Sequence, residues 1–405
     1  METVDLLIKN ASELVTLKGP NRPRIKEEMN NLSIIKKGSM AIKNGIIVET
    51  GKNIKYKAEK TIDASGKTVM PGFVDPHTHL VFAGSREFEL DMKLRGLSYM
   101  DILKEGGGIF YTVNKTREAI NGELIDQSKI RLDNMLAHGT TTCEAKSGYG
   151  LKTDTELKIL KIHKKLNETH KMDIISTFLG AHAVPKEHSA DEYVDIVVNE
   201  MIPQVKNLAS FCDVFCEEGV FTVEQSRRIL KTGKEHGLVP KIHADEIVDT
   251  GGAALAAEVG AISADHLLMS SDKGLCQMAK EGVIGVLLPG TPFSLMMQKY
   301  SDARKMINLD VPVALATDLN PNCWTESMQF MIQLACFNMK LTPAEAVTAA
   351  TFNAACAIGL SETVGSFEKG KQADVIILDC PNHKFIPYHF GVNLVETVIK
   401  KGCLL

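Results

Sequence analysis

The feature of this sequence that most restricts its fold is a repeated alternation of short apolar runs with stretches of helical periodicity, which begins at Val69. The apolar runs read VMPGFVD, TTCEAK, DIISTFLGA, SFCDVFC, VPKIHA, AISADH, VIGVLL and PVALAT. Neighbouring parallel strands need a helical crossover between them, and a closed ring of such strands has no open edge. The pattern therefore predicts an α/β fold whose main unit is a (β/α)8 TIM-like barrel.

The two ends of the chain have a different pattern, in which short β-type runs replace the alternation. Before the barrel lie VDLLIKNA and GSMAIKNGIIVETG, with a turn signal at Lys43-Asn44-Gly45, and after it lie ADVIILDC and LVETVIKKG. The C-terminal runs most simply join the N-terminal strands in one sheet. We expect a small β-sandwich domain from residues 1–67 plus 361–405, and a barrel domain from residues 68–360.

The overall composition favours a small-molecule partner. The 405 residues carry a formal net charge of -4, and the isoelectric point near 6.3 provides no basic surface for nucleic acid or an anionic membrane. The N-terminal METVDLLIKN lacks the charged start and apolar core of a secretion signal, and nine scattered cysteines suit reduced thiols better than disulfides. We therefore expect a cytoplasmic protein that binds neither nucleic acid nor a membrane.

Barrels of this kind carry their functional residues at the carboxyl ends of the strands. We assign His182 to the end of the fourth strand, His243 to the sixth and His266 to the seventh. The full set of polar residues at these ends comprises His77, His79, Glu144, Lys146, His182, Glu217, Glu218, His243, Asp245, Glu246, His266, Asp318 and Asn320. Five histidines and an aspartate are thus predicted to meet at one mouth of the barrel.

His77 and His79 lie two residues apart on one strand, so both side chains point to the same side. Such a pair alone is as often hydrogen-bonded core as metal ligand. The addition of His243 and Asp318 from distant strand ends favours a metal, because three neutral imidazoles and a carboxylate suit Zn²⁺ or Fe and leave a position open for water. Burying these groups without a cation would be costly.

Several stretches of the chain are also characteristic of one protein family. They are DPHTHLVFAGSREFELDMKLRGLSYMDILKEGGGI, EAKSGYGL, FLGAHAVP, HADEI, SADHL and TDLNP, and they extend over essentially the whole chain. With these motifs the sequence resembles the amidohydrolase superfamily of metal-dependent hydrolases and, within it, the imidazolonepropionase family. The resemblance implies hydrolysis of 4-imidazolone-5-propanoate to N-formimidoyl-L-glutamate in histidine degradation, and it implies a homodimer.

The resemblance also implies one metal ion per chain, Zn²⁺ or Fe³⁺, held by His77, His79, His243 and Asp318. Some binuclear relatives place a carboxylated lysine at the end of strand four, where we expect His182. The choice between zinc and iron stays open, because both ions accept this set of ligands.

Three residues are candidates for the chemistry itself. The metal would lower the pKa of a bound water, and either Asp318 or Glu246 would act as the general base that takes its proton and returns it to the leaving ring nitrogen. His266 would hydrogen-bond the carbonyl oxygen as negative charge develops there, a contribution of about 3 kcal/mol per donor. The structural alternative for His266 is a buried histidine that bonds a backbone carbonyl.

The propionate of the substrate requires a fixed cation, and Arg86 fits this need because guanidinium pairs bidentately with carboxylate. A surface arginine is the alternative interpretation. Further substrate contacts are implied by the resemblance for Tyr149, His182 and Glu246, and for the loop residues Asn320, Asn322 and Cys323.

The loop after the last strand departs from the family pattern. Family members commonly have glycine followed by serine or threonine where this chain has Asn322 and Cys323. Asparagine tolerates a positive φ, so we expect the turn to persist. The Cys323 thiol is a weaker hydrogen-bonding group than the hydroxyl it replaces, which affects the fine substrate contact but not the hydrolytic chemistry.

Two other functions compete with this interpretation. One is a heterocycle deaminase or another cyclic-amide hydrolase, since one fold hosts many substrates. The combination of Arg86, Tyr149 and His182 argues against it. The other is a scaffold without catalytic activity, and the presence of all four predicted metal ligands argues against that.

Overall fold

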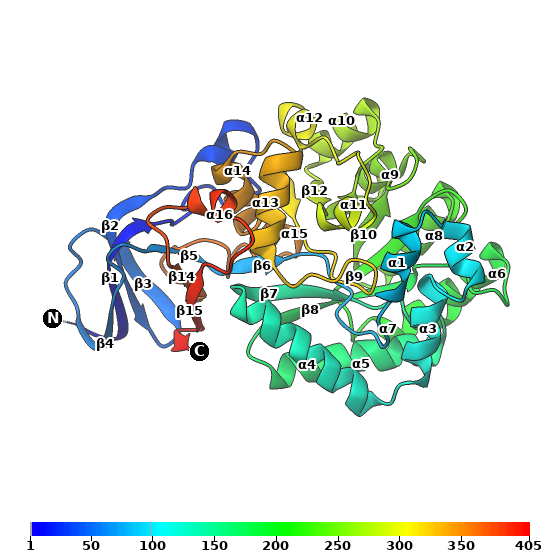
Figure 1. Cartoon of the computed structure of the whole chain (residues 1–405), viewed down its shortest axis with the longest axis horizontal. Helices are drawn as coiled ribbons and strands as arrows, with labels where there is room; N and C mark the ends of the chain where they lie inside the picture. The colour runs from blue at the N-terminus through cyan, green and yellow to red at the C-terminus, as the bar shows by residue number, and fades with distance from the viewer. Residues whose placement is uncertain (1, 98) are drawn as a thin grey trace.

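The computed structural model of the chain describes residues 2–97 and 99–405, so Ser98 of the first family motif lies outside the described residues. It contains an 8-stranded parallel sheet, in the order β13-β12-β11-β10-β9-β8-β7-β6, and a second 8-stranded sheet built from both ends of the chain. Figure 1 shows the second sheet at one side of the molecule, in the blue and red of the chain ends, and the barrel with its helices at the other. The predicted fold class is confirmed.

The barrel strands are short, and most of their residues are buried. Burial on both faces explains why they are continuous apolar runs in the sequence rather than alternating ones. The strands are β6 (Phe73–Asp75), β7 (Thr140–Lys146), β8 (Asp173–Ala181), β9 (Phe211–Cys216), β10 (Val239–Ala244), β11 (Ser263–His266), β12 (Ile284–Leu287) and β13 (Val313–Leu315).

The first and the last strand meet at the mouth of the barrel. The backbone N–H of Asp318 donates to the carbonyl of His77 at 3.1 Å, and the N–H of His79 donates to the carbonyl of Leu319 at 2.8 Å. A parallel bridge between Thr78 and Leu319 marks the same seam. The backbone that closes the ring therefore belongs to the segments that carry three of the predicted metal ligands.

Helices cover the outside of the barrel (Figure 1). The helices of the described chain are α1 (Phe88–Leu94), α2 (Tyr99–Lys104), α3 (Ile109–Glu118), α4 (Asn121–Ala137), α5 (Thr153–Thr169), α6 (Ala190–Ile196), α7 (Ile202–Val205), α8 (Val223–Glu235), α9 (Gly252–Val259), α10 (Asp272–Glu281), α11 (Gly290–Ser294), α12 (Ala303–Asn308), α13 (Met328–Asn338), α14 (Pro343–Ala349), α15 (Phe352–Ala357) and α16 (Phe385–Tyr388), with the 3-10 helix η1 (Lys26–Asn30) and the π-helix η2 (Val197–Met201).

Helix α8 illustrates how the sequence sets these elements. The side chain of Thr222 caps its first turn by accepting from the N–H of Gln225, and Ile229 and Leu230 are buried on the face that packs on β9 and β10. In the part of the chain that is described, no helix has the length and apolar character needed to cross a bilayer.

The strand numbering expected from the sequence is wrong by one position. β8 is the third strand and precedes His182, whereas β10 and β11, which carry His243 and His266, are the fifth and sixth. The eight apolar runs of the sequence already have this order, so the error lies in the numbering and not in the expected strands. The fourth strand, β9, is followed by Glu217, so a bridging lysine is missing there as well.

The second sheet has the order β16-β15-β14-β5-β1-β2-β3, and β4 pairs with β1. Its strands are β1 (Thr3–Leu14), β2 (Ile35–Lys43), β3 (Ile46–Gly51), β4 (Lys57–Asp63), β5 (Thr68–Pro71), β14 (Val375–Leu378), β15 (Val395–Lys400) and β16 (Cys403–Leu404). β5 joins the two chain ends, because it pairs with β1 on one side and β14 on the other. The domain boundaries at 67/68 and 360/361 stay a prediction.

The turn signal in the N-terminal segment forms the hairpin between β2 and β3. Asn44 and Gly45 have φ values of 51° and 75°, the left-handed backbone that these two residue types tolerate best.

A buried ion pair fastens the second sheet to the barrel. Lys400, at the end of β15, lies 2.6 Å from Asp374 and 2.7 Å from Asp173, the first residue of β8. Because Asp173 is at the amino end of its strand, this contact lies at the end of the barrel opposite the predicted site.

Candidate metal centre and active site

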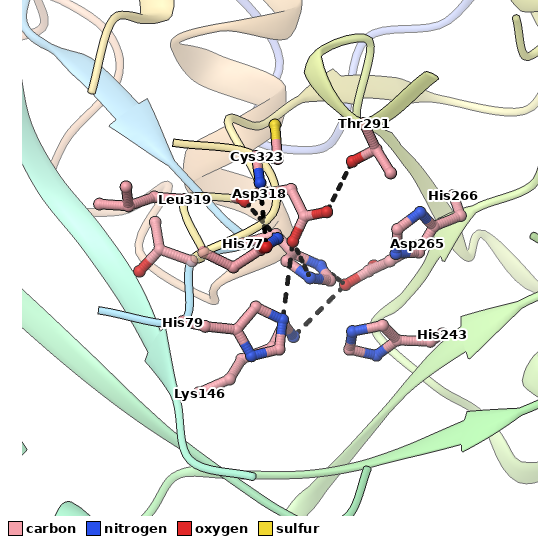
Figure 2. A network of polar contacts seen from close by, with 12 residues as sticks. His77, His79, Lys146, His243, Asp265, His266, Thr291, Asp318, Leu319 and Cys323 are labelled. Atoms are coloured by element: carbon pink, nitrogen blue, oxygen red, sulfur yellow. Dashed lines mark hydrogen bonds and ion pairs between the residues drawn. The ribbon is translucent and has the colours of Figure 1, made fainter. Parts of the chain in front are cut away.

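Three histidines from two strands converge at the mouth of the barrel. His77 and His79 follow β6, His243 lies on β10, and one ring nitrogen from each lies within 4.8 Å of the others. All three residues are buried. Figure 2 shows their rings turned toward a common centre, with the carboxylate of Asp318 facing the same point.

Asp318 completes this group from the segment that follows the last strand, β13. One carboxylate oxygen, Oδ1, lies 3.5 Å from His77 Nε2 and 3.6 Å from His79 Nε2. The other, Oδ2, accepts a hydrogen bond from the Thr291 hydroxyl at 2.6 Å. The residue has a φ of 53°, a strained conformation for a residue other than glycine. The structure thus brings together all four predicted metal ligands.

The donor atoms fit a metal ion better than they fit one another. The Nε2 atoms of His77 and His243 are buried and, within the described residues, have no hydrogen-bond partner. Such atoms are rare because they cost free energy. Burial, with repulsion from neighbouring positive groups, holds the pKa of His77 and of His79 well below the ordinary value, so both rings are neutral, as metal ligands must be. Burial also acts to lower the pKa of His243, but the adjacent Asp213 outweighs it and raises that pKa.

The two candidate bases differ in their protonation. Burial raises the pKa of Asp318 to about 6. Burial, followed by repulsion from Asp318, raises the pKa of Glu246 to about 8. At neutral pH Asp318 is therefore mostly ionised and Glu246 mostly protonated, a separation that suits one base and one acid.

His266 points into the same centre from β11. Its ring lies 5.5 Å from that of His77 and 5.3 Å from that of His243, and its Nδ1 lies 3.6 Å from Glu246 Oε1. This Nδ1 is buried without a hydrogen-bond partner among the described residues, so it does not bond a backbone carbonyl. The backbone φ of 75° turns the residue out of the strand direction.

His182 and Tyr149 form one wall of the site. The His182 ring stacks on the His79 ring, with centroids 4.8 Å apart and planes 13° from parallel. The Tyr149 ring lies 5.5 Å from that of His79 and 5.3 Å from that of His182. Both predicted substrate contacts are therefore next to a predicted metal ligand.

Two buried carboxylates shape the loops that carry site residues. Glu156 accepts hydrogen bonds from three backbone N–H groups around Tyr149, at 2.7 to 2.9 Å. Glu217 accepts from three consecutive N–H groups that begin at Glu246, at 2.9 to 3.2 Å. Because each loop is tied down at several points, Tyr149 and Glu246 have fixed backbone positions.

Arg86 is not a surface arginine, since its side chain is only 8% exposed. Its Nε and Nη2 donate to the two carboxylate oxygens of Glu89 at 2.7 and 2.8 Å. Glu89 also accepts from the N–H of Gly108 at 2.7 Å, at the start of α3. The guanidinium is thus held rigidly, and its charge is partly balanced before any substrate arrives.

The loop after β13 is held by Asn320, which lies at the edge of the site. Its side-chain NH₂ donates to the carbonyl of Asp318, and its side-chain oxygen accepts from the N–H groups of Asn322 and Cys323. Asn322 is not among the residues with positive φ, so the turn persists without the left-handed backbone that we expected there. The Cys323 thiol is buried, and its Sγ lies 3.6 Å from the Thr317 carbonyl.

A cavity of about 720 Å³ opens beside this loop. Arg86, Lys93, Asn322, Cys323 and Trp324 contribute to its wall, whereas the four predicted metal ligands do not. Lys93, on α1, donates to the Asn322 side-chain oxygen at 2.6 Å and so ties that helix to the loop. Of the residues in this wall, Cys323 contacts the segment of Asp318, because its Sγ lies 3.6 Å from the carbonyl of Thr317.

Sequence reasoning missed three residues that contact the predicted ligands. Asp213 on β9 and Asp265 on β11 are fully buried beside two of the histidines, and Thr291 donates to Asp318. A signal for the two aspartates exists in the sequence, because FCDVFC and SADH each place a carboxylate within a buried strand, where charges are seldom found without a partner.

The chain matches the model of the family described as "Amidohydrolase family" over residues 68–405. It is 56% identical to the imidazolonepropionase of Geobacillus kaustophilus (strain HTA426), over 98% of this chain and 97% of that protein. It is 53% identical to the imidazolonepropionase of Alkaliphilus metalliredigens (strain QYMF), over 99% of this chain and 98% of that protein.

Among solved structures, the chain is similar to an adenosine deaminase from Xanthomonas campestris with bound zinc, with a TM-score of 0.74 and 19% identity over 100% of this chain and 93% of that one. It is also similar to a triazine hydrolase variant, with a TM-score of 0.75 and 14% identity over 99% of this chain and 94% of that one. At these identities the likeness concerns the fold alone.

Proposed function

We infer the function from one premise: this chain belongs to the amidohydrolase family and, within it, to the imidazolonepropionases. It is a hydrolase that opens the cyclic amide of 4-imidazolone-5-propanoate with one water molecule and gives N-formimidoyl-L-glutamate, a step of histidine degradation. The observation that carries this function is the high identity to curated imidazolonepropionases along nearly the whole chain. A deaminase is not favoured, because the deaminase structure agrees with this chain only in fold.

The metal ligands in this proposal are His77, His79, His243 and Asp318, which together would hold one Zn²⁺ or Fe³⁺ per chain. The meeting of these four side chains and the unpartnered Nε2 atoms support the assignment. Such an ion would lower the pKa of a water molecule and polarise the ring carbonyl.

Asp318 and Glu246 divide the proton transfers between them. Asp318, which is ionised and oriented by Thr291, takes a proton from the attacking water. Glu246, which is protonated, gives its proton to the ring nitrogen as the C–N bond breaks. A proton passed from Asp318 to Glu246 restores both groups for the next cycle.

The other predicted residues hold the substrate. His266 donates to the carbonyl oxygen while negative charge develops on it. Arg86 uses Nε and Nη2 to bind Glu89, which leaves Nη1 for the propionate carboxylate. The ring lies against the wall formed by Tyr149 and His182, and Asn322 and Cys323 border it on the side of the cavity.

We also propose that the protein is a cytoplasmic homodimer. The free state of all nine cysteines supports a reducing compartment. Exposed aromatic side chains on and near α13 and α16, Phe337 at 53%, Tyr388 at 75% and Phe390 at 65%, support a contact with a second copy. Light scattering of the wild type and of Phe390→Asp tests the dimer, since the variant should run as a monomer.

The hydrolytic function is tested by following the ultraviolet absorbance of imidazolonepropionate together with metal analysis of the purified protein. We expect disappearance of the imidazolone and about one zinc or iron per chain. Activity on cytosine or dihydroorotate, with none on the imidazolone, would refute the proposal in favour of the other hydrolase functions.

A further inference from the structure

Inside the barrel, next to the predicted metal centre, five charged side chains with 0% exposure form a connected group, which we call the buried ion network: Glu144, Lys146, Asp213, Lys241 and Asp265. The Lys146 ammonium is central, at 2.7 Å from Asp213, 3.0 Å from Glu144 and 3.4 Å from Asp265. The Lys241 ammonium lies 3.2 Å from Glu144 and donates to the Pro76 carbonyl at 3.1 Å.

Two carboxylates of the buried ion network reach the histidines of the metal centre. Asp265 Oδ2 lies 2.6 Å from His77 Nδ1, and Figure 2 shows the two side chains facing each other. Asp213 Oδ2 lies 3.1 Å from His243 Nδ1, although this contact does not reach hydrogen-bond geometry. Each contact occupies the Nδ1 side of a ring, so Nε2 is the nitrogen turned toward the centre.

The atoms shared in these contacts connect the two histidines. Lys146 contacts the same Oδ2 atom of each aspartate that faces a histidine. The remaining oxygen of Asp265 accepts from the Ser263 hydroxyl at 2.7 Å. The Lys146 ammonium therefore restrains both carboxylates, that of Asp213 beside His243 and that of Asp265 beside His77.

We propose that Asp265 and Asp213, joined by Lys146, are positioning residues that aim the Nε2 atoms of His77 and His243 at the metal. Carboxylates behind ligating histidines fix the ring orientation and the position of its proton, and raise the basicity of the nitrogen that binds. The inference rests on the metal ligands given under the proposed function.

The charges of the buried ion network support the same role. Two ammonium groups face three carboxylates, which leaves one negative charge in excess where water cannot screen it. An uncompensated charge in the interior is costly, and a cation held by the adjacent histidines would balance it. The network thus favours a cation at the centre by its charge as well as by its geometry.

The test is the affinity of the full-length, metal-depleted protein for Co²⁺, measured by competition with a chelator, together with the visible absorption bands of the bound ion. Asp265→Asn and Lys146→Met should weaken Co²⁺ binding by about 10- to 100-fold and alter the bands. Ser263→Ala, a mild change that removes one hydrogen bond to Asp265, should weaken it by a smaller factor.

Lys400→Met is the matched control, because it also removes a buried ammonium that contacts two aspartates, Asp173 and Asp374, but at the end of the barrel opposite the predicted site. It should lower the melting temperature yet leave Co²⁺ affinity within about threefold of the wild-type value. Equal losses of Co²⁺ affinity in Lys146→Met and Lys400→Met, or wild-type affinity and bands in Asp265→Asn, would overturn the inference. If Asp265→Asn does not fold, unchanged affinity in Ser263→Ala overturns it.

Hydrolysis of imidazolonepropionate by the wild type, measured on the same preparations, tests the proposed function separately. An inactive wild type whose variants still follow the expected order of Co²⁺ affinity would refute the function and support the inference. An active wild type whose Asp265→Asn variant binds Co²⁺ normally would support the function and refute the inference.

Discussion

Replacing Thr291 with valine should slow hydrolysis while leaving the shape of the site almost unchanged. Threonine and valine are nearly equal in size, so the substitution removes chiefly the hydroxyl that donates to Asp318 Oδ2 at 2.6 Å. Thr291 and Asp318 are each at most 5% exposed, so bulk water is a poor substitute for the lost donor. The carboxylate then loses the contact that aims its other oxygen at the histidines.

The size of the effect follows from the kind of hydrogen bond that is lost. A hydrogen bond to a charged group contributes about 1.5 to 3 kcal/mol. If this contribution is present in the transition state, its loss lowers kcat by about 10- to 100-fold, at roughly 1.4 kcal/mol for each factor of ten. KM should change little, because Thr291 has no part in holding the propionate.

The pH profile should move as well. Burial raises the pKa of Asp318 to about 6, and the Thr291 hydrogen bond works against that rise by stabilising the ionised form. Without the donor the pKa rises further. Since Asp318 acts as a base only when ionised, the acid limb of the kcat/KM profile should shift to higher pH.

The assay is steady-state hydrolysis of imidazolonepropionate from pH 5 to 9, with Thr348→Val as the matched control. Thr348 is also buried and its hydroxyl also makes a short bond, at 2.8 Å to the Met29 carbonyl, but it lies on α14 away from the site. The control should keep the wild-type kcat and acid limb. A Thr291→Val enzyme with unchanged kcat and acid limb would contradict the orienting role.

Four further outcomes are expected. Glu246→Gln cannot give up a proton, so it should lower kcat by about 10²- to 10⁴-fold. The loss of activity that the wild type shows as pH rises through about 8 should be absent in this variant. If the variant still loses activity there, that loss belongs to the titration of another group. Arg86→Lys should raise KM with metal content unchanged, and an unchanged KM would remove Arg86 from the carboxylate site. His266→Ala should lower kcat by about 10²- to 10³-fold with full metal content, and loss of the metal would instead make it a ligand. Burial alone would raise the pKa of Glu13, but hydrogen bonds, first of all those from His383, outweigh it and lower the pKa to about 2. In urea unfolding at pH 7, Glu13→Gln should therefore have a smaller free energy of unfolding than the wild type, and the difference should vanish as pH falls from about 4.5 to 2. A difference that does not change with pH would contradict this.

The barrel and the meeting of His77, His79, His243 and Asp318 could be predicted from the sequence, because both depend on simple periodicities. Strands and helices alternate along the chain, and strand ends gather at one mouth whatever their exact order. The error of one in the strand numbering therefore left the predicted ligand set unaffected.

The contacts of individual side chains could not be predicted, because they depend on which strands are neighbours. Asp265 lies next to His266 in the sequence, yet its partner is His77, 188 residues away. The position of Arg86 likewise depends on Glu89, whose carboxylate is in turn held by the N–H of Gly108. The pattern SREFE allows this pair, but an exposed pair would have the same spacing.

Because the segments that follow β6 and β13 pair with each other, the predicted site can assemble only after the last strand has been synthesised. His77 and His79 leave the ribosome early, whereas Asp318 and Leu319, whose backbone pairs with them, are made more than 200 residues later. A nascent chain cannot bring His77, His79, His243 and Asp318 together until the ring of strands is complete. The last of the four predicted ligands to be synthesised thus belongs to the segment that closes the ring.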